Sequence, residues 1–220
     1  MHIAPIMSFI EVRMFARLAI AVSLLAASAA VAADKDKPKN DPENTPLELT
    51  ITGKVVKFEL DTGGMTSEEY KKTIEDAGKG RGARPPAPPK VELAVEIKNT
   101  SDKSVTVWTK GDPVTLDLEL KGKGAVSIAP PLAFTREFRL PQGVEIAPGK
   151  SVSIPVKSLT SGFRSASVFS YWTAPGEYEL IAKLKTGMNP PPKGAKEADE
   201  GFGEVKLTSA PLKLTVVEKK

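Results

Sequence analysis

The segment from Ser161 to Thr173 holds the densest cluster of aromatic and hydroxyl side chains in the chain. Aromatic rings beside an arginine can stack on a sugar or anchor a partner peptide, as interface hot spots do. The same rings could instead be strand residues that pack in a core. We therefore take this segment as the candidate partner-binding site, with burial as the alternative reading; its members are Phe163, Arg164, Phe169, Tyr171 and Trp172.

Paired carboxylates are the groups whose spacing comes closest to a catalytic arrangement. Asp117 and Glu119 would share one face of a strand, as would Glu92 and Glu96, because alternate strand residues point the same way. Two carboxylates about 5–9 Å apart are what a glycosidase requires. Alternating acids on a wet strand face commonly serve only solvation, and nothing in the sequence indicates an environment that would tune their pKa.

Cysteine is absent from the chain, and histidine is absent beyond residue 2. The single histidine is His2, and there is no cysteine. Histidine is the usual general base near neutral pH and the commonest metal ligand. Without these residues the chain beyond residue 33 cannot build Ser-His-Asp or Cys-His sites, nor zinc, copper or haem sites that need His or Cys. We expect no enzymatic activity, no cofactor and no metal site.

The N-terminal segment has the three parts of a secretory signal peptide. An apolar run over residues 18–33 follows Arg17 and ends in the small residues Ala30-Val31-Ala32. The run has about 16 residues, fewer than the roughly 20 that span a bilayer. We predict a signal peptide over residues 1–33, with Met14 as an alternative start. The protein is then exported to the periplasm or the exterior, without stable membrane insertion after cleavage.

The charge balance beyond the leader is close to neutral. Removing Glu11, Arg13 and Arg17 from the 31 basic and 27 acidic residues leaves 29 and 26. A nucleic-acid-binding domain normally has a clustered basic face, which is missing here, so we expect no nucleic-acid partner. Residues 34–46 are charged and contain three prolines, which predicts a flexible linker. One domain then covers residues 47–220.

Period-two alternation dominates that domain and predicts half-buried antiparallel strands. Turn signals rich in Gly, Pro, Asn and Asp separate the strands, and seven or more such strands favour a β-sandwich. Pro155 indicates an edge strand, because proline cannot donate to a sheet ladder. The apolar positions are Val91, Leu93, Val95 and Ile97; Val114, Leu116, Leu118 and Leu120; Val152, Ile154 and Val156; Tyr178, Leu180, Ala182 and Leu184; and Leu212, Leu214 and Val216.

The first and last strands each change phase. Apolar residues move from odd to even positions around Gly53, and again around Pro211. A one-residue slip turns every side chain to the other face, so each strand needs a bulge or bend at that point. Terminal strands that bend or switch sheets are what the edges of a two-sheet sandwich would use.

Two insertions interrupt the strand pattern, at residues 61–89 and 187–202. In the first, Thr66-Ser-Glu-Glu69 is a capping box that predicts a helix over about residues 67–77. The proline-rich loop Pro85-Pro-Ala-Pro-Pro89 follows it, either as a stiff spacer or as a ligand for an aromatic groove.

Three turn motifs stand out between Val91 and Leu184: Asn99-Thr-Ser-Asp-Lys103, Ala147-Pro-Gly-Lys150 and Pro175-Gly-Glu-Tyr-Glu-Leu180. With these motifs the stretch resembles bacterial immunoglobulin-like sandwich domains, and is weakly similar to the BsuPI-type proteinase-inhibitor domain. The resemblance implies an immunoglobulin-like antiparallel β-sandwich with Tyr178 as its tyrosine corner. Trp108 is then either the buried strand tryptophan, with Val105 and Val107 facing outward, or an exposed contact residue.

These observations predict an exported, non-enzymatic β-sandwich domain that binds a protein or glycan partner or has a structural role in the cell envelope. A proteinase inhibitor is the first alternative, on the turn motifs alone. A carboxylate-dependent hydrolase is the second.

Overall fold

The computed structural model describes residues 45–82, 84–129, 138–162 and 166–219. In these residues the predicted all-β, sandwich-like class is confirmed. A small sheet has the order β1-β3-β8, with both pairs antiparallel. Its strands are β1 (Leu47–Gly53), β3 (Lys90–Asn99) and β8 (Ser151–Ser158). Pro155 lies on β8, an edge strand of this sheet, as predicted.

The large sheet is built around the 14-residue strand β11. One side of β11 pairs with β13 and β12, and the other side with β5 and β4. Strands β2 and β7 extend the sheet beyond β13 and β4. The members are β2 (Lys57–Leu60), β4 (Val105–Lys110), β5 (Thr115–Lys121), β7 (Gln142–Ile146), β11 (Gly176–Asn189), β12 (Gly203–Thr208) and β13 (Leu212–Glu218).

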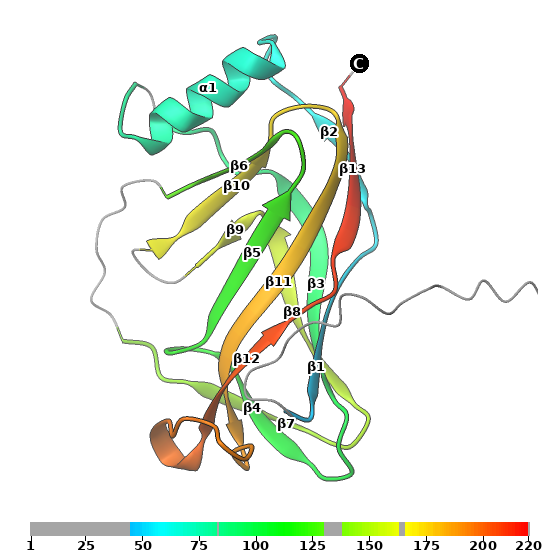
Figure 1. The fold of residues 1–220 in the computed structure, drawn as a ribbon, viewed down its shortest axis with the longest axis vertical. Helices are drawn as coiled ribbons and strands as arrows, with labels where there is room; N and C mark the ends of the chain where they lie inside the picture. Colours follow the sequence, from blue (N-terminus) through cyan, green and yellow to red (C-terminus); the bar gives the residue numbers. More distant parts are fainter. Residues whose placement is uncertain (1–44, 83, 130–137, 163–165, 220) are drawn as a thin grey trace, which may run out of the picture. The chain divides into compact units, whose positions relative to one another are not determined.

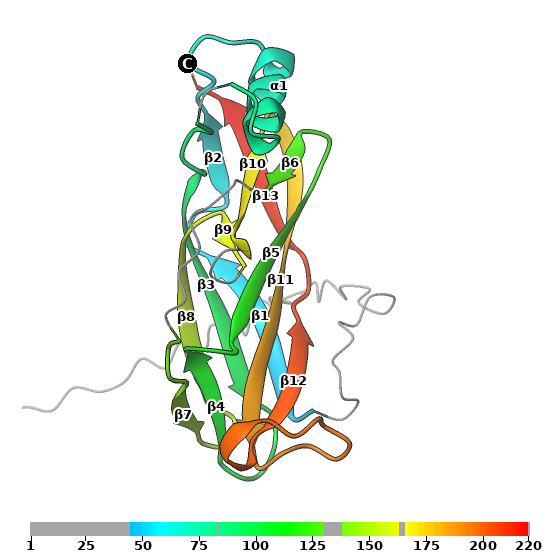
Figure 2. The same ribbon diagram turned by 90° about the vertical axis from the view of Figure 1, so that its left-hand side faces the viewer.

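The small and large sheets face each other across one hydrophobic core (Figure 2). Alternate residues of β1 and β3 meet alternate residues of β11, β12 and β13, which is why the period-two pattern was so regular. The most deeply buried members include Val95, Ile97, Leu180, Leu184 and Leu214, each at most 1% exposed.

A third, short sheet has the order β6-β10-β9 and is covered by the helix α1 (Figure 1). Its strands are β6 (Ala125–Ile128), β9 (Thr160–Ser161) and β10 (Val168–Trp172). The helix spans Ser67–Gly78, and its Ile74 packs with Val126, Ile128 and Tyr171 in a separate small core. The predicted capping box is present, because Thr66 and Glu69 bond each other's backbone amides.

The phase change at Gly53 is a switch between sheets, as predicted. Strand β1 pairs with β3 up to the Gly53–Leu93 pair, and the chain then crosses to join β13 as the parallel strand β2. A Cβ at Gly53 would overlap the end of the Leu93 side chain, so a larger residue at this bend would force that buried side chain to move.

The phase change before Pro211 is a break between β12 and β13, which pair with successive parts of β11. Ser209 bridges the break: its backbone N–H donates to the Ala182 carbonyl at 2.9 Å, and its Oγ accepts from the Ala182 N–H at 2.9 Å. A side-chain oxygen thus supplies the acceptor for the buried amide where the strand loses its register.

The second insertion is shorter than the sequence predicted. Residues 187–189 continue β11, where Met188 pairs with both Gly203 and Val107, so the loop between β11 and β12 begins at residue 190. It contains a 3₁₀ turn, Asp199–Gly201. No helix in the described part of the chain is long and apolar enough to span a membrane. The predicted signal peptide and most of the predicted linker, through residue 44, lie outside the described residues.

Candidate functional site

Two of the four rings in the predicted aromatic binding platform are buried in the structure. Tyr171 is 0% exposed and Trp172 is 4% exposed, so neither can stack on a ligand. Phe169 is half-buried against the small core beneath α1. Phe163 and Arg164 lie outside the described residues. The alternative of core packing therefore holds for the part of the segment that the structure describes, because α1 and β2 bring cover from far away in the sequence.

Tyr171 fastens the proline-rich loop to the domain. Its hydroxyl donates to the Pro86 carbonyl at 2.8 Å, and its ring packs on Ile74 of α1. Burial, with a smaller contribution from Tyr70, raises the pKa of Tyr171 to about 12. The pKa of Tyr70 is also raised, by burial and by the Asp61 carboxylate. These shifts reflect packing between elements.

Trp172 and Tyr178 belong to the main core. The Trp172 ring stacks on Phe58 of β2 with centroids 5.0 Å apart, and meets Tyr178 at 6.5 Å. The Tyr178 hydroxyl donates to the carbonyl of Ala174, four residues upstream, at 2.6 Å. This is the contact that defines a tyrosine corner. Cβ atoms at Gly122 or Gly124 would crowd the Tyr178 ring or hydroxyl, so glycine at both positions leaves room for it.

Trp108 is buried, as one of its two predicted placements has it, but Val105 and Val107 do not face outward. It is 2% exposed, yet Val105 and Val107 are buried as well and face the core. Trp108 points to the other face of β4, where the loop after β11 covers it and Phe202 stacks on it at 4.4 Å. A Cβ at Gly187 would overlap its ring, so glycine there lets the ring lie flat on β11. Strand β4 is therefore buried on both faces, on one side by the core and on the other by the loop after β11.

One member of the predicted carboxylate pair on β5 is held by two lysines. Asp117 and Glu119 lie on the outer face of the large sheet, where Glu119 bonds Lys183 at 2.7 Å and Lys121 at 3.3 Å. The Lys183 hydrogen bond is the main reason that the pKa of Glu119 is lowered, which is the wrong direction for a general acid.

Glu92 and Glu96 line a common hollow on the small sheet. They are four residues apart on β3, so their Cα atoms are about 13 Å apart. Their carboxyl groups would reach the spacing of a glycosidase pair, about 5–9.5 Å, only if the two side chains turn toward each other. Within the described residues there is also no group of three or more Asp, Glu, His or Cys side chains that could hold a metal ion.

An open groove between β5 and β8 is the best candidate site. It encloses about 700 Å³ and reaches from the surface to Leu184 on β11, which is 1% exposed. Apolar side chains from both sheets form its walls, and its lining residues are Thr109, Lys110, Gly111, Val114, Leu116, Phe138, Arg139, Leu140, Gln142, Ile154, Gly162 and Leu184.

The groove exists because the chain leaves the large sheet between β4 and β5. Gly111 has φ of +84°, and a Cβ there would overlap the backbone of Leu140. The segment before β7 is fastened at the same point, since the Asp112 N–H donates to the Arg139 carbonyl at 2.8 Å. The Arg139 N–H donates in return to the Asp112 carboxylate at 3.0 Å. These bonds hold Phe138 and Leu140 at the rim.

The rim carries the most exposed large apolar side chains of the described surface. Leu140 is 76% exposed and Phe138 is 62% exposed. The sequence pattern does not single them out, because Phe138-Arg-Leu140 lies outside every predicted strand and only its position beside the groove makes it notable. The available signal was two large apolar side chains on either side of an arginine, outside any predicted element.

No protein-family model matches the chain, and no curated protein is significantly similar to it. The resemblance to immunoglobulin-like and BsuPI-type domains therefore stays a prediction.

Proposed function

We propose that this chain is an exported, non-catalytic β-sandwich domain that binds a partner of the cell envelope or exterior through the open groove. One observation carries the proposal: Phe138 and Leu140 are largely exposed beside an apolar groove that opens into the core. Exposed apolar side chains next to a concave apolar surface are typical of binding sites.

The rival functions draw less support. The glycan reading depended on an aromatic platform, and two of its rings are buried. The hydrolase alternative needs two converging acids, whereas Glu119 is paired with Lys121 and Lys183. The proteinase-inhibitor alternative rests on turn motifs, and no family model adds to it.

Partner capture from a cell-envelope extract tests the proposal. The test variant carries Phe138→Asp and Leu140→Asp, which place charges on the rim without touching the core. The matched control carries Val55→Asp and Val56→Asp, because these are two other exposed apolar residues, at 46% and 41%, outside the lining of the open groove. We expect the rim variant to lose the partner and the control to retain it. Equal recovery by wild type and both variants, all equally stable, would refute the proposal.

A further inference from the structure

The walls of the open groove are apolar and come from both sheets of the sandwich. Val114 directly precedes β5, Leu116 lies on β5 and Ile154 lies on β8, and all three are only partly buried. Leu184 forms the floor. At about 700 Å³ the hollow has the size of a small-molecule site, and such sites combine apolar walls with a few polar groups that fix the ligand.

The charged side chains of the lining have one sign. Lys110 and Arg139 both line the groove, both are exposed, and the described lining contains no Asp or Glu. Within the described residues neither side chain forms an ion pair. Asp112, whose carboxylate accepts the Arg139 backbone N–H, is 6% exposed and lies outside the lining. A ligand with a negative group at the rim therefore matches the charge of the groove.

We propose that the open groove binds the anion of a fatty acid. This inference rests on the proposed function and names the ligand class of the same site. The alkyl chain lies against Val114, Leu116 and Ile154, and the carboxylate lies at the rim beside Lys110 and Arg139. An alkyl chain needs no hydrogen bonds, which suits walls that offer few donors or acceptors. A carboxylate can accept bonds from both cations.

Two quantities follow from this arrangement. Each methylene that enters the groove should raise affinity about fourfold, from the transfer free energy of a buried CH₂. Reversing both rim cations should lower affinity for the anion about tenfold, because each exposed charge pair contributes modestly.

Isothermal titration calorimetry with the purified protein measures both effects. The ligands are decanoate, dodecanoate, dodecanol and dodecyltrimethylammonium, each below its micelle concentration. We expect dodecanoate to bind more tightly than decanoate and than either of the other twelve-carbon ligands. In the Lys110→Glu, Arg139→Glu variant, dodecanoate should lose about tenfold in affinity, while dodecanol should bind as before.

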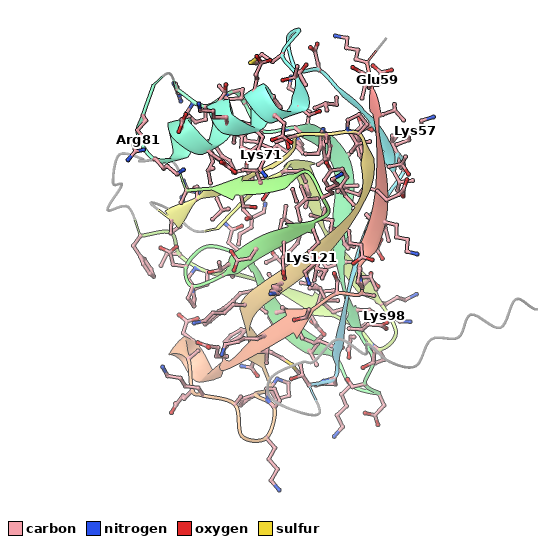
Figure 3. The ribbon with its side chains drawn as sticks, turned by 45° about the horizontal axis from the view of Figure 1, so that its top comes forward. Lys57, Glu59, Lys71, Arg81, Lys98 and Lys121 are labelled. Carbon is pink, nitrogen blue, oxygen red and sulfur yellow. The ribbon has the colours of Figure 1, made fainter. Side chains whose placement is uncertain are left out.

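The matched control reverses two exposed lysines elsewhere, Lys57→Glu on β2 and Lys98→Glu on β3 (Figure 3). It should bind dodecanoate like wild type. Equal binding of all three twelve-carbon head groups, equal loss in the control, or no binding of dodecanoate would overturn the fatty-acid inference. If envelope-partner capture still depends on Phe138 and Leu140 in that case, the proposed function survives and the ligand is of another class.

Discussion

Asn99 offers the sharpest test of how a buried polar side chain holds this fold. It is 0% exposed at the end of β3. Its Nδ2 donates to the carbonyls of Lys103 at 2.7 Å and Ile146 at 2.8 Å. Its Oδ1 accepts from the N–H of Ser101 at 2.9 Å and from its hydroxyl at 2.7 Å. One side chain thereby closes the β3–β4 turn and fastens it to the end of β7.

Asn99→Ala removes these four bonds and leaves the backbone bonds of residue 99 with Gly149 and Lys150 in place. The Ile146 carbonyl then lacks its side-chain donor in a buried setting, which costs about 1–3 kcal/mol. Loss of the bonds to the partly exposed Lys103 carbonyl and to the Ser101 N–H and hydroxyl adds about 1 kcal/mol to this cost. We expect the free energy of unfolding to fall by about 2–4 kcal/mol, measured by urea denaturation with tryptophan fluorescence.

Asn99→Asp tests the donor role separately, because it keeps the shape and the acceptor but replaces the NH₂ group. The carboxylate would face two carbonyl oxygens in a buried site, so its folded pKa would lie above its unfolded pKa. The stability of this variant, relative to wild type, is then highest below the unfolded pKa and falls as pH rises through the folded pKa. Asp102→Ala, an exposed change in the same turn, should alter stability by less than about 0.5 kcal/mol.

A free energy of unfolding for Asn99→Ala within about 0.5 kcal/mol of the wild-type value would contradict the structural role of this side chain. A stability difference between Asn99→Asp and wild type that does not depend on pH between 3 and 7 would contradict its role as a donor.

Three further predictions concern the buried rings. Tyr178→Phe, which removes the hydrogen bond to Ala174, should lower the free energy of unfolding by about 1–2 kcal/mol in urea denaturation. Gly187→Ala should cost about 1–3 kcal/mol by overlap with Trp108, and thermal unfolding should show most of that loss recovered when Trp108→Leu is added. Burial raises the pKa of Tyr171 from 10.0 to about 12. The contribution of the neutral phenol to the free energy of unfolding should therefore be complete below pH 10 and fall by about 2–3 kcal/mol as pH rises to 12. Tyr171→Phe should show a smaller alkaline loss in pH-dependent denaturation; an unchanged loss would contradict this assignment.

The sequence by itself determined the strands and their irregularities. Side chains alternate along a strand whatever its partners are, so the pattern from Val91 to Ile97 locates β3. The phase changes at Gly53 and before Pro211 located the switch from β1 to β2 and the break before β13. The Thr66–Glu69 capping box located the start of α1, because it needs only residues three apart.

Only the tertiary structure decided which side chains are covered. Tyr171 lies under α1, Trp172 packs on Phe58, and Trp108 lies under Phe202, and each cover comes from a distant segment. The sequence pattern shows on which face of a strand a residue lies. Whether that face is buried depends on packing against segments that are distant in the sequence. For the same reason the aromatic segment looked like a binding site and is largely core, while Leu140 drew no attention and stands exposed beside the open groove.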